Sequence, residues 1–532
     1  MPHLRRHLLL AVTLGTLAAA AFAQATTLSE QRAEQRTARA FDAAKKLGTP
    51  TLYAFLAPMP KGADLHMHLS GAVYAETFLR EAVAQGLCVN TATLSLAAPA
   101  ADKACSKPDV PAADILKDQH LYDQLVDSFS MRGFVPTPGT TGHDQFFATF
   151  ARFGAAKNPG EWLDEVASRA AAQNEQYLEI MQTPSFSHAA ALGYKLGWPQ
   201  DATDHIAPSE LAALRTALLA IGLRDEVPTD IHELSDALTA RSALEHCDSR
   251  TTARPACTIQ IHFLYQVLRA FPPQQVFAQT LLGFEVAEAA LKANPASPLV
   301  VGINFVQPED DRRAMADYHL QMQMLDYLHS VYPDVKLSLH AGELAPGIVP
   351  PEGLRFHIRE AIDLGHASRI GHGVDVFYET DAPALLRQMA AQHIMVEINL
   401  TSNDGILGVK GSAHPLHGYM AAHVPWALST DDEGVNRSDL TTEYVKAAEE
   451  QGLTYLDLKR SARTALEHAF LAGNSLWAKP DEFTRLNSSC TAPVLATSKP
   501  TPHCADFLQH NEKAAAQYEL ERRFVAFESA QR

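Results

Sequence analysis

Short apolar runs, separated by stretches with helical periodicity, recur along most of this 532-residue chain. Any single run could be a strand or a segment of buried helix, but eight of them alternate with helical stretches. Strands that alternate with helices favour a parallel sheet, and eight such units close into a barrel. We therefore expect an α/β fold, a (β/α)8 TIM barrel with helical insertions and an N-terminal helical extension. The predicted strands are Ala63–Met67, Gln176–Met181, Thr258–Leu264, Leu299–Val306, Val335–Leu339, Arg369–Gly371, Ile394–Leu400 and Pro425–Ser429.

The spacing of these strands is uneven, which predicts insertions. We expect a barrel domain over residues 58–475 with insertions near 87–141 and 184–255. The charged, Ala-rich stretch Leu28–Leu47 predicts a surface or partner-contacting helix within an N-terminal helical extension, residues 24–57. Residues 476–532 are expected to form a C-terminal helical extension. Helical periodicity is clear at Pro208–Ile221, Asp311–Ser330, Pro383–Gln392, Leu456–Leu471 and Asn511–Glu528.

The N-terminus has the pattern of a secretory signal peptide, residues 1–23. Arg5 and Arg6 precede the apolar stretch Leu8–Phe22, which is too short to span a bilayer. Ala21-Phe22-Ala23 fits a cleavage site. An uncleaved anchor is the alternative. We expect a periplasmic or secreted protein, cleaved near Ala23.

The net charge argues against some partners. Removal of Arg5 and Arg6 takes two positive charges from a formal charge of −17, leaving −19. So acidic a protein is a poor candidate for binding nucleic acid or anionic membrane through bulk electrostatics. We therefore expect no nucleic acid and, after signal cleavage, no membrane as partner; a homodimer stays open.

The six cysteines form three pairs of sequence neighbours and lie outside the predicted strands. In an oxidising compartment, three local disulfides are the expected arrangement, although six cysteines permit fifteen connectivities. No Cys-x-x-Cys is present, which argues against a thiolate zinc site. The cysteines are Cys88, Cys105, Cys247, Cys257, Cys490 and Cys504.

Histidines and acids follow several of the predicted strands, where a barrel has its catalytic mouth. His66 and His68 are two apart in a strand, so both rings point to one side. Taken alone, each could be a hydrogen-bonded core histidine or a helix-capping acid. Together they supply three imidazoles and a carboxylate for one zinc ion with an open position, as hydrolysis by metal-activated water requires. The candidates are His66, His68, His340, Glu343, His372, Asp431 and Asp432.

These residues stand in segments that resemble the adenosine deaminase family. The similarity covers all eight predicted strands, and the signal peptide, insertions and cysteines look more like its secreted, growth-factor-related branch. The segments are Pro60–Gly71, His340–Glu343, Arg369–Gly373, Val396–Ile398, Thr401–Asn403, His414–Pro415 and Ser429–Asp432.

The resemblance implies a role for each candidate. One Zn²⁺ per chain would be held by His66, His68, His340 and Asp431. His372 would position the attacking water and help to deprotonate it, Glu343 would protonate purine N1, and Asp432 would bind N7. The implied reaction is attack of zinc-bound hydroxide at purine C6, which converts adenosine or 2′-deoxyadenosine to the inosine product and ammonia. A modified adenine nucleoside or another aminopurine is the alternative substrate, and a non-catalytic purine-binding protein is a further one.

Two residues depart from the family pattern, and both are expected substrate contacts together with Asp432 and His68. Gln307 stands where the family usually has a glycine whose backbone contacts purine N3, and its side-chain amide could substitute. Ser70 replaces an aspartate that helps to bind the ribose 5′-hydroxyl in cytosolic members. The reaction type is therefore better defined than the purine substrate.

Overall fold

Eight parallel strands form one sheet whose spatial order follows the chain order. The computed structural model describes residues 29–100, 104–200, 202, 204–490 and 499–531, so the predicted signal peptide lies outside the described residues. All eight predicted strands are confirmed, with boundaries shifted by a few residues. They are β1 (Gly62–His68), β5 (Glu175–Gln182), β6 (Gln260–Leu268), β7 (Val300–Val306), β8 (Lys336–Ala341), β9 (Arg369–His372), β10 (Met395–Ile398) and β11 (Trp426–Leu428).

The sheet closes into a barrel through the segment that follows β11. Asp431 forms a parallel bridge with Met67 of β1. Its N–H donates to the carbonyl of His66 at 2.8 Å, and its carbonyl accepts from the N–H of His68 at 3.4 Å. A predicted functional residue thus also makes the contact that closes the barrel.

Helices pack around the outside of the barrel and the inward side chains of the strands fill its interior, so both faces of the sheet are buried. The predicted helix Asp311–Ser330 is two helices, because Asp317 leaves helical geometry with φ −98° and ψ 6°. The surrounding helices are α7 (Pro159–Ala172), α11 (Pro273–Ala293), α12 (Arg312–Ala316), α13 (Tyr318–Val331), α14 (His357–Asp363), α15 (Ala382–Gln392), α16 (Leu400–Leu407), α17 (Leu416–Ala421), α18 (Glu433–Asn436), α19 (Leu440–Glu450) and α20 (Tyr455–His468). Short 3-10 turns are η4 (Pro351–Leu354), η5 (Val376–Tyr378) and η6 (Gly411–Ala413).

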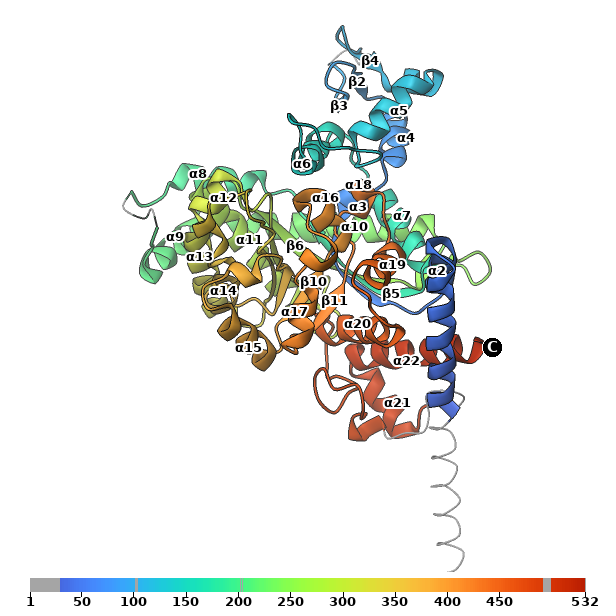
Figure 1. Cartoon of the computed structure of the whole chain (residues 1–532). Coiled ribbons are helices and arrows are strands. Elements are labelled where there is room, and N and C mark those ends of the chain that lie inside the picture. Colours follow the sequence, from blue (N-terminus) through green and yellow to red (C-terminus); the bar gives the residue numbers. More distant parts are fainter. Residues whose placement is uncertain (1–28, 101–103, 201, 203, 491–498, 532) are drawn as a thin grey trace, which may run out of the picture.

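The segment between β1 and β5 projects from one end of the barrel (Figure 1). It contains a small antiparallel sheet of order β3-β2-β4, which the sequence patterns did not predict. Its helix α6 (Gly142–Phe153) returns to the barrel and packs so closely on α16 that a Cβ at Gly142 would lie 1.9 Å from the carbonyl oxygen of Gly405. The elements are α3 (Leu69–Ala72), α4 (Ala75–Gln85), β2 (Cys88–Asn90), β3 (Ser95–Ala97), β4 (Val110–Pro111), η1 (Ala112–Lys117), α5 (Gln119–Ser128) and α6 (Gly142–Phe153).

The segment between β5 and β6 is helical and packs against α11 and α7. It comprises α8 (Ser187–Leu196), α9 (Pro208–Ala220), η2 (Leu223–Glu226), α10 (Val227–Leu244) and η3 (Pro255–Thr258).

The two ends of the described chain pack on each other. The helix over residues 29–46 and α2 (Thr49–Leu56) contact the C-terminal helix through the rings of Phe41, Phe55 and Phe527. Lys459 of α20 pairs with both Glu34 and Glu528. The N-terminal helix therefore packs on this chain's own barrel and C-terminal helix. The remaining C-terminal elements are η7 (Ser488–Cys490), α21 (Pro502–Gln509) and α22 (Glu512–Ala530).

All six cysteines are bridged, and the expected pairing of sequence neighbours is confirmed. The disulfides are Cys88–Cys105, Cys247–Cys257 and Cys490–Cys504. Each closes a loop outside the barrel strands. Among the described helices, none combines the length and apolarity that crossing a bilayer would require.

Candidate metal centre and active site

Four of the predicted ligands converge at the mouth of the barrel. His66 and His68 end β1, His340 lies near the end of β8, and Asp431 follows β11. All four are buried, and one donor atom from each lies within 4.8 Å of the others. Because the carboxyl ends of parallel strands meet at one end of a barrel, residues far apart in the chain form one cluster.

The separations between donor atoms fit a tetrahedral metal. His68 Nε2 lies 3.3 Å from His340 Nε2 and 3.2 Å from Asp431 Oδ1. His66 Nε2 lies 3.5 Å from the same carboxylate oxygen. Ligand atoms held at about 2.0–2.1 Å from zinc in a tetrahedron are roughly 3.4 Å apart.

Each of the three histidines is oriented by an oxygen on its outer nitrogen, Nδ1. Glu397 accepts from His66 at 2.6 Å, Gln266 from His68 at 2.5 Å and Asn304 from His340 at 3.0 Å. These contacts leave the Nε2 atoms facing the shared centre, and His66 Nε2 is buried without a hydrogen-bond partner. Outer partners of this kind fix the tautomer and ring orientation of metal-binding histidines.

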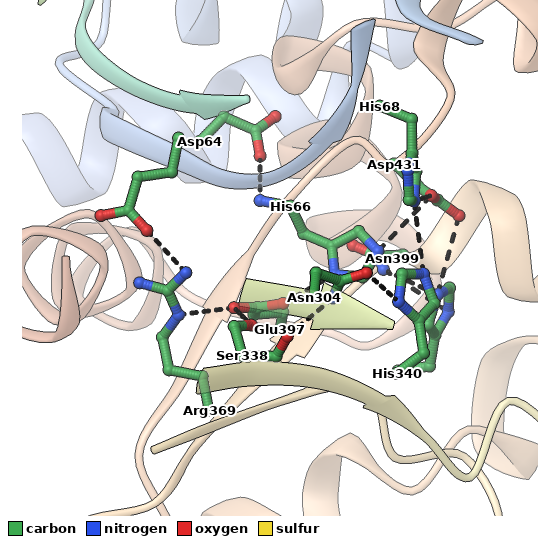
Figure 2. A network of polar contacts seen from close by, with 12 residues as sticks. Asp64, His66, His68, Asn304, Ser338, His340, Arg369, Glu397, Asn399 and Asp431 are labelled. Carbon is green, nitrogen blue, oxygen red and sulfur yellow. Dashed lines mark hydrogen bonds and ion pairs between the residues drawn. The ribbon is translucent and has the colours of Figure 1, made fainter. Parts of the chain in front are cut away.

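Buried ionic contacts extend this network away from the mouth, as Figure 2 shows. Arg369 is fully buried and pairs with Glu397 and Glu179, each at 2.6 Å. The other oxygen of Glu397 binds His66, so the position of that ring depends on an ion pair.

The electrostatics of the cluster suit a cation. Burial alone would lower the pKa of His66, but the neighbouring carboxylates of Asp431 and Glu397 raise it to about 10. Burial and the neighbouring histidines hold the pKa of His340 well below its usual value, which keeps that ring neutral. Three imidazoles and a carboxylate therefore fit a divalent ion such as zinc.

Glu343 and His372 lie beside this cluster. Burial, followed by the charges of Asp431 and Glu309, raises the pKa of Glu343 well above its ordinary value. The backbone of Glu343 is held in place by Glu309, whose carboxylate accepts hydrogen bonds from the N–H groups of Gly342 at 2.9 Å and Glu343 at 2.7 Å. A carboxyl group held in this way can deliver a proton near neutral pH.

His372 reaches the site from a strained turn. Its φ of 69° is in the left-handed region, and Tyr419 holds the next residue by donating its hydroxyl to the Gly373 carbonyl at 2.6 Å. The ring nitrogens lie 3.6 Å from Glu343 Oε1 and 3.8 Å from Asp431 Oδ2. Burial lowers the pKa of His372 to about 3, so the ring is neutral. Such backbone strain clusters at functional sites, where the surrounding structure maintains it.

The fourth acid, Asp432, points into the same space. A Cβ at Gly71 would lie 1.5 Å from Asp432 Oδ1, so the glycine makes room for this side chain. Burial and the charge of Asp431 raise the pKa of Asp432 well above its ordinary value. Asp432 can therefore act as a hydrogen-bond donor.

The predicted residues open into a cavity of about 460 Å³, a size typical of small-molecule sites. Its lining combines aromatic side chains from α6 and α7 with residues of the metal cluster. It is lined by His68, Ser70, Phe146, Phe147, Phe150, Trp162, Met181, Gln182, Thr183, Gln266, Leu268, Val306, Gln307, Pro308, His340, Glu343, Asp431 and Asp432.

Gln307 adopts an unusual conformation in this wall. Its φ is 95°, a left-handed value that favours glycine. Its side-chain oxygen accepts from the N–H of Ala270 at 2.8 Å, so only the amide nitrogen remains for a ligand. The chain thus keeps a glycine-like backbone here while carrying a large side chain.

The sequence patterns missed the residues that orient the ligands. Asn304 lies within the predicted strand Leu299–Val306, and Gln266 lies just beyond another predicted strand. The one available signal was Glu397, a carboxylate inside the apolar run Ile394–Leu400. A charged residue at a core position usually has a buried partner.

Comparison with known proteins adds an independent observation. A family model described as adenosine deaminase matches residues 232–477. Residues 232–477 are therefore similar to the adenosine deaminase family. The resemblance inferred from the motifs is therefore confirmed at the level of the family.

The individual relatives that this chain matches are named adenine deaminase or adenosine deaminase. The adenine deaminase of Rhizobium leguminosarum bv. trifolii (strain WSM2304) is 30% identical over 227 residues, which cover 42% of this chain and 62% of the relative. The adenosine deaminase of Escherichia coli (strain SE11) is 37% identical over 137 residues, 26% of this chain and 38% of the relative. The chain thus matches less than two thirds of the length of either relative.

Solved structures with a related arrangement include an adenine deaminase from Arthrobacter aurescens, at 14% identity and a TM-score of 0.48, covering 78% of this chain and 94% of that chain. An N6-mAMP deaminase from Arabidopsis is 19% identical with a TM-score of 0.48, covering 79% of this chain and 96% of that chain.

Proposed function

We propose that this protein is a metal-dependent aminohydrolase that converts adenosine or 2′-deoxyadenosine to the inosine product and ammonia. The observation that carries the proposal is a complete His3Asp donor set, of which His68, His340 and Asp431 line one cavity together with Glu343, a buried carboxyl group with a raised pKa. A bound zinc ion, one per chain, would supply activation of water at neutral pH.

The residues around the donor set can supply the proton transfer, the orientation of water and the binding of the purine. Glu343 lies beside the cluster and burial raises its pKa, so it can donate its proton to the ring nitrogen N1 as C6 is attacked. His372 lies between Glu343 and Asp431 and can orient the attacking water. Burial also raises the pKa of Asp432, so its protonated form can donate a hydrogen bond to N7.

The charge of the cavity favours a nucleoside over a nucleotide. Among the described residues, no lysine or arginine lines the space, so a phosphate group would enter without a cationic partner. The wall of Phe146, Phe147 and Phe150 is instead suited to an uncharged ring.

The second candidate substrate is another aminopurine, including a modified adenine nucleoside or adenine itself. The observation that favours it is Gln307, because its side chain occupies part of the wall at a glycine-like backbone position. The name of the Rhizobium relative points in the same direction.

A substrate panel tests both candidates. Purified, zinc-loaded protein is assayed for ammonia release from adenosine, 2′-deoxyadenosine, adenine and AMP. We expect kcat/KM for adenosine to exceed that for AMP by at least about 100-fold, the effect of burying an unpaired charge. Preferred turnover of AMP would contradict the charge argument, and inactivity on every purine would reject the deaminase proposal.

We also propose export to the periplasm or the medium, as in the growth-factor-related branch. The three disulfides support it, since such bonds persist in oxidising compartments. Intact mass measurement of the exported protein is expected to place the new N-terminus just after Ala23. A full-length mass in the membrane fraction would indicate an uncleaved anchor instead.

A further inference from the structure

Two buried residues behind His372 connect its ring to the protein backbone. Asn403 lies on α16, and His414 precedes α17. Both belong to the segments that resemble the family, yet neither lines the cavity. The contacts run from the N–H of Leu416 to His414 at 3.2 Å, from His414 to Asn403 at 3.1 Å and from Asn403 to His372 at 2.9 Å.

The backbone N–H at one end of this chain of hydrogen bonds determines which atom is the donor in each of them. The N–H of Leu416 can only donate, so Nδ1 of His414 accepts. Burial lowers the pKa of His414 to about 4, so the ring is neutral and carries its one proton on Nε2. That N–H donates to Asn403 Oδ1 and thereby settles which end of the amide is oxygen.

The orientation of the Asn403 amide in turn determines that His372 accepts a hydrogen bond. With its oxygen bound to His414, Asn403 presents its Nδ2 donor to Nδ1 of His372. A ring whose Nδ1 accepts a hydrogen bond has no proton there and carries its proton on Nε2. That nitrogen faces Asp431 and the metal-ligand cluster. Asn399 Nδ2 lies 3.4 and 3.5 Å from the two ring nitrogens and so favours neither tautomer.

We propose that Asn403 and His414 are positioning residues, which hold His372 in the tautomer protonated at Nε2, so that it meets the attacking water as a hydrogen-bond donor. The inference rests on the proposed function. In this tautomer neither nitrogen has a free lone pair, because Nδ1 accepts from Asn403 and Nε2 carries the proton. His372 therefore orients the water, and the deprotonating role implied by the family resemblance would need the other tautomer.

Asn403→Asp is the variant that tests this proposal most directly. It keeps the shape of the side chain and reverses the hydrogen bond to His372. The carboxylate that it introduces would accept from both neighbours, so His372 would carry its proton on Nδ1 and present a bare Nε2 to the water. We expect kcat for adenosine to fall at least roughly tenfold, with KM and zinc content unchanged. Unchanged kcat, or a loss explained by lost zinc, would overturn the proposal.

Variants of His414 separate positioning from folding. His414→Gln keeps an N–H donor near the Nε2 position, whereas His414→Phe removes it. We expect a clear loss of kcat in His414→Phe and substantial recovery in His414→Gln. His417→Gln is the matched control, because His417 lies on the adjacent α17 and donates to the carbonyl of Gln451, away from the site. Equal losses in all three variants would show that only packing matters.

A spectroscopic measurement decides the tautomer without any turnover. Zinc-loaded protein with ¹⁵N-labelled histidine is examined by long-range ¹H–¹⁵N correlation, and His372 is assigned by its disappearance in His372→Gln. We expect Nε2 protonation in the unaltered protein and Nδ1 protonation in Asn403→Asp. The same tautomer in both would overturn the proposal. Should the protein deaminate no purine, the proposed function fails while this result still decides the tautomer.

Discussion

Glu343→Gln is expected to keep its metal and to lose about 10²- to 10⁴-fold in kcat for adenosine. Burial and the nearby charges of Asp431 and Glu309 raise the pKa of this carboxyl group and so favour its protonated form, whereas an amide of the same shape has no acidic proton to give. The backbone of the turn stays in place, because its N–H groups are held by Glu309. Steady-state kinetics and elemental analysis of the same preparation measure the two quantities.

Glu352→Gln provides the control for this result. Glu352 is exposed on η4, lies outside the cavity, and carries the same change from carboxyl to amide. Its kcat should match that of the unaltered protein within a factor of about two, as for surface substitutions generally. Full activity of Glu343→Gln, or loss of its metal, would show that Glu343 is not the proton donor.

Two substitutions at the metal cluster, one of a ligand and one of a residue that orients a ligand, are expected to weaken zinc binding to different degrees. His340→Ala removes a ligand whose ring is neutral and ready to bind, so the protein should lose both its metal and its turnover. Glu397→Gln leaves all four ligands in place but replaces the charged acceptor that orients His66 and balances Arg369. We expect zinc to bind about 10- to 100-fold more weakly in this second variant.

Competition with a zinc-binding dye, together with elemental analysis after dialysis, measures both steps. The control is Glu379→Gln, since Glu379 is also a buried carboxylate but accepts only the N–H groups of Ile358 and Arg359. Its zinc affinity should be unchanged. A His340→Ala protein that binds zinc and turns over normally would refute the ligand assignment, and equal effects of both glutamate variants would show a general loss of stability.

The barrel could be predicted because its strands are buried on both faces. Runs such as Leu299–Val306 must be apolar throughout, and β7 covers nearly the same residues. The break at Asp317 was not predictable from periodicity, because apolar spacing continues across it. The antiparallel strands β2, β3 and β4 are two or three residues long, which is too short for a periodic pattern.

The candidate site was predictable for the same reason that the barrel was. Residues at the carboxyl ends of parallel strands meet at one mouth, so His66, His340 and Asp431 could be grouped before any distance was known. The residues that orient them were not predictable in this way. Which histidine faces Gln266, Asn304 or Glu397 depends on the register and tilt of the strands. A local sequence pattern carries no information about either.

The sequence by itself determined the barrel, the set of ligands and the presence of an acid beside them, because chain order and strand ends carry that information. Only the tertiary structure decided that Asp431 closes the barrel, that Gln307 adopts a left-handed backbone, and that Asn403 and His414 set the proton on His372. Those features depend on the direction of individual hydrogen bonds between segments distant in sequence, and such directions exist only once the chain has folded.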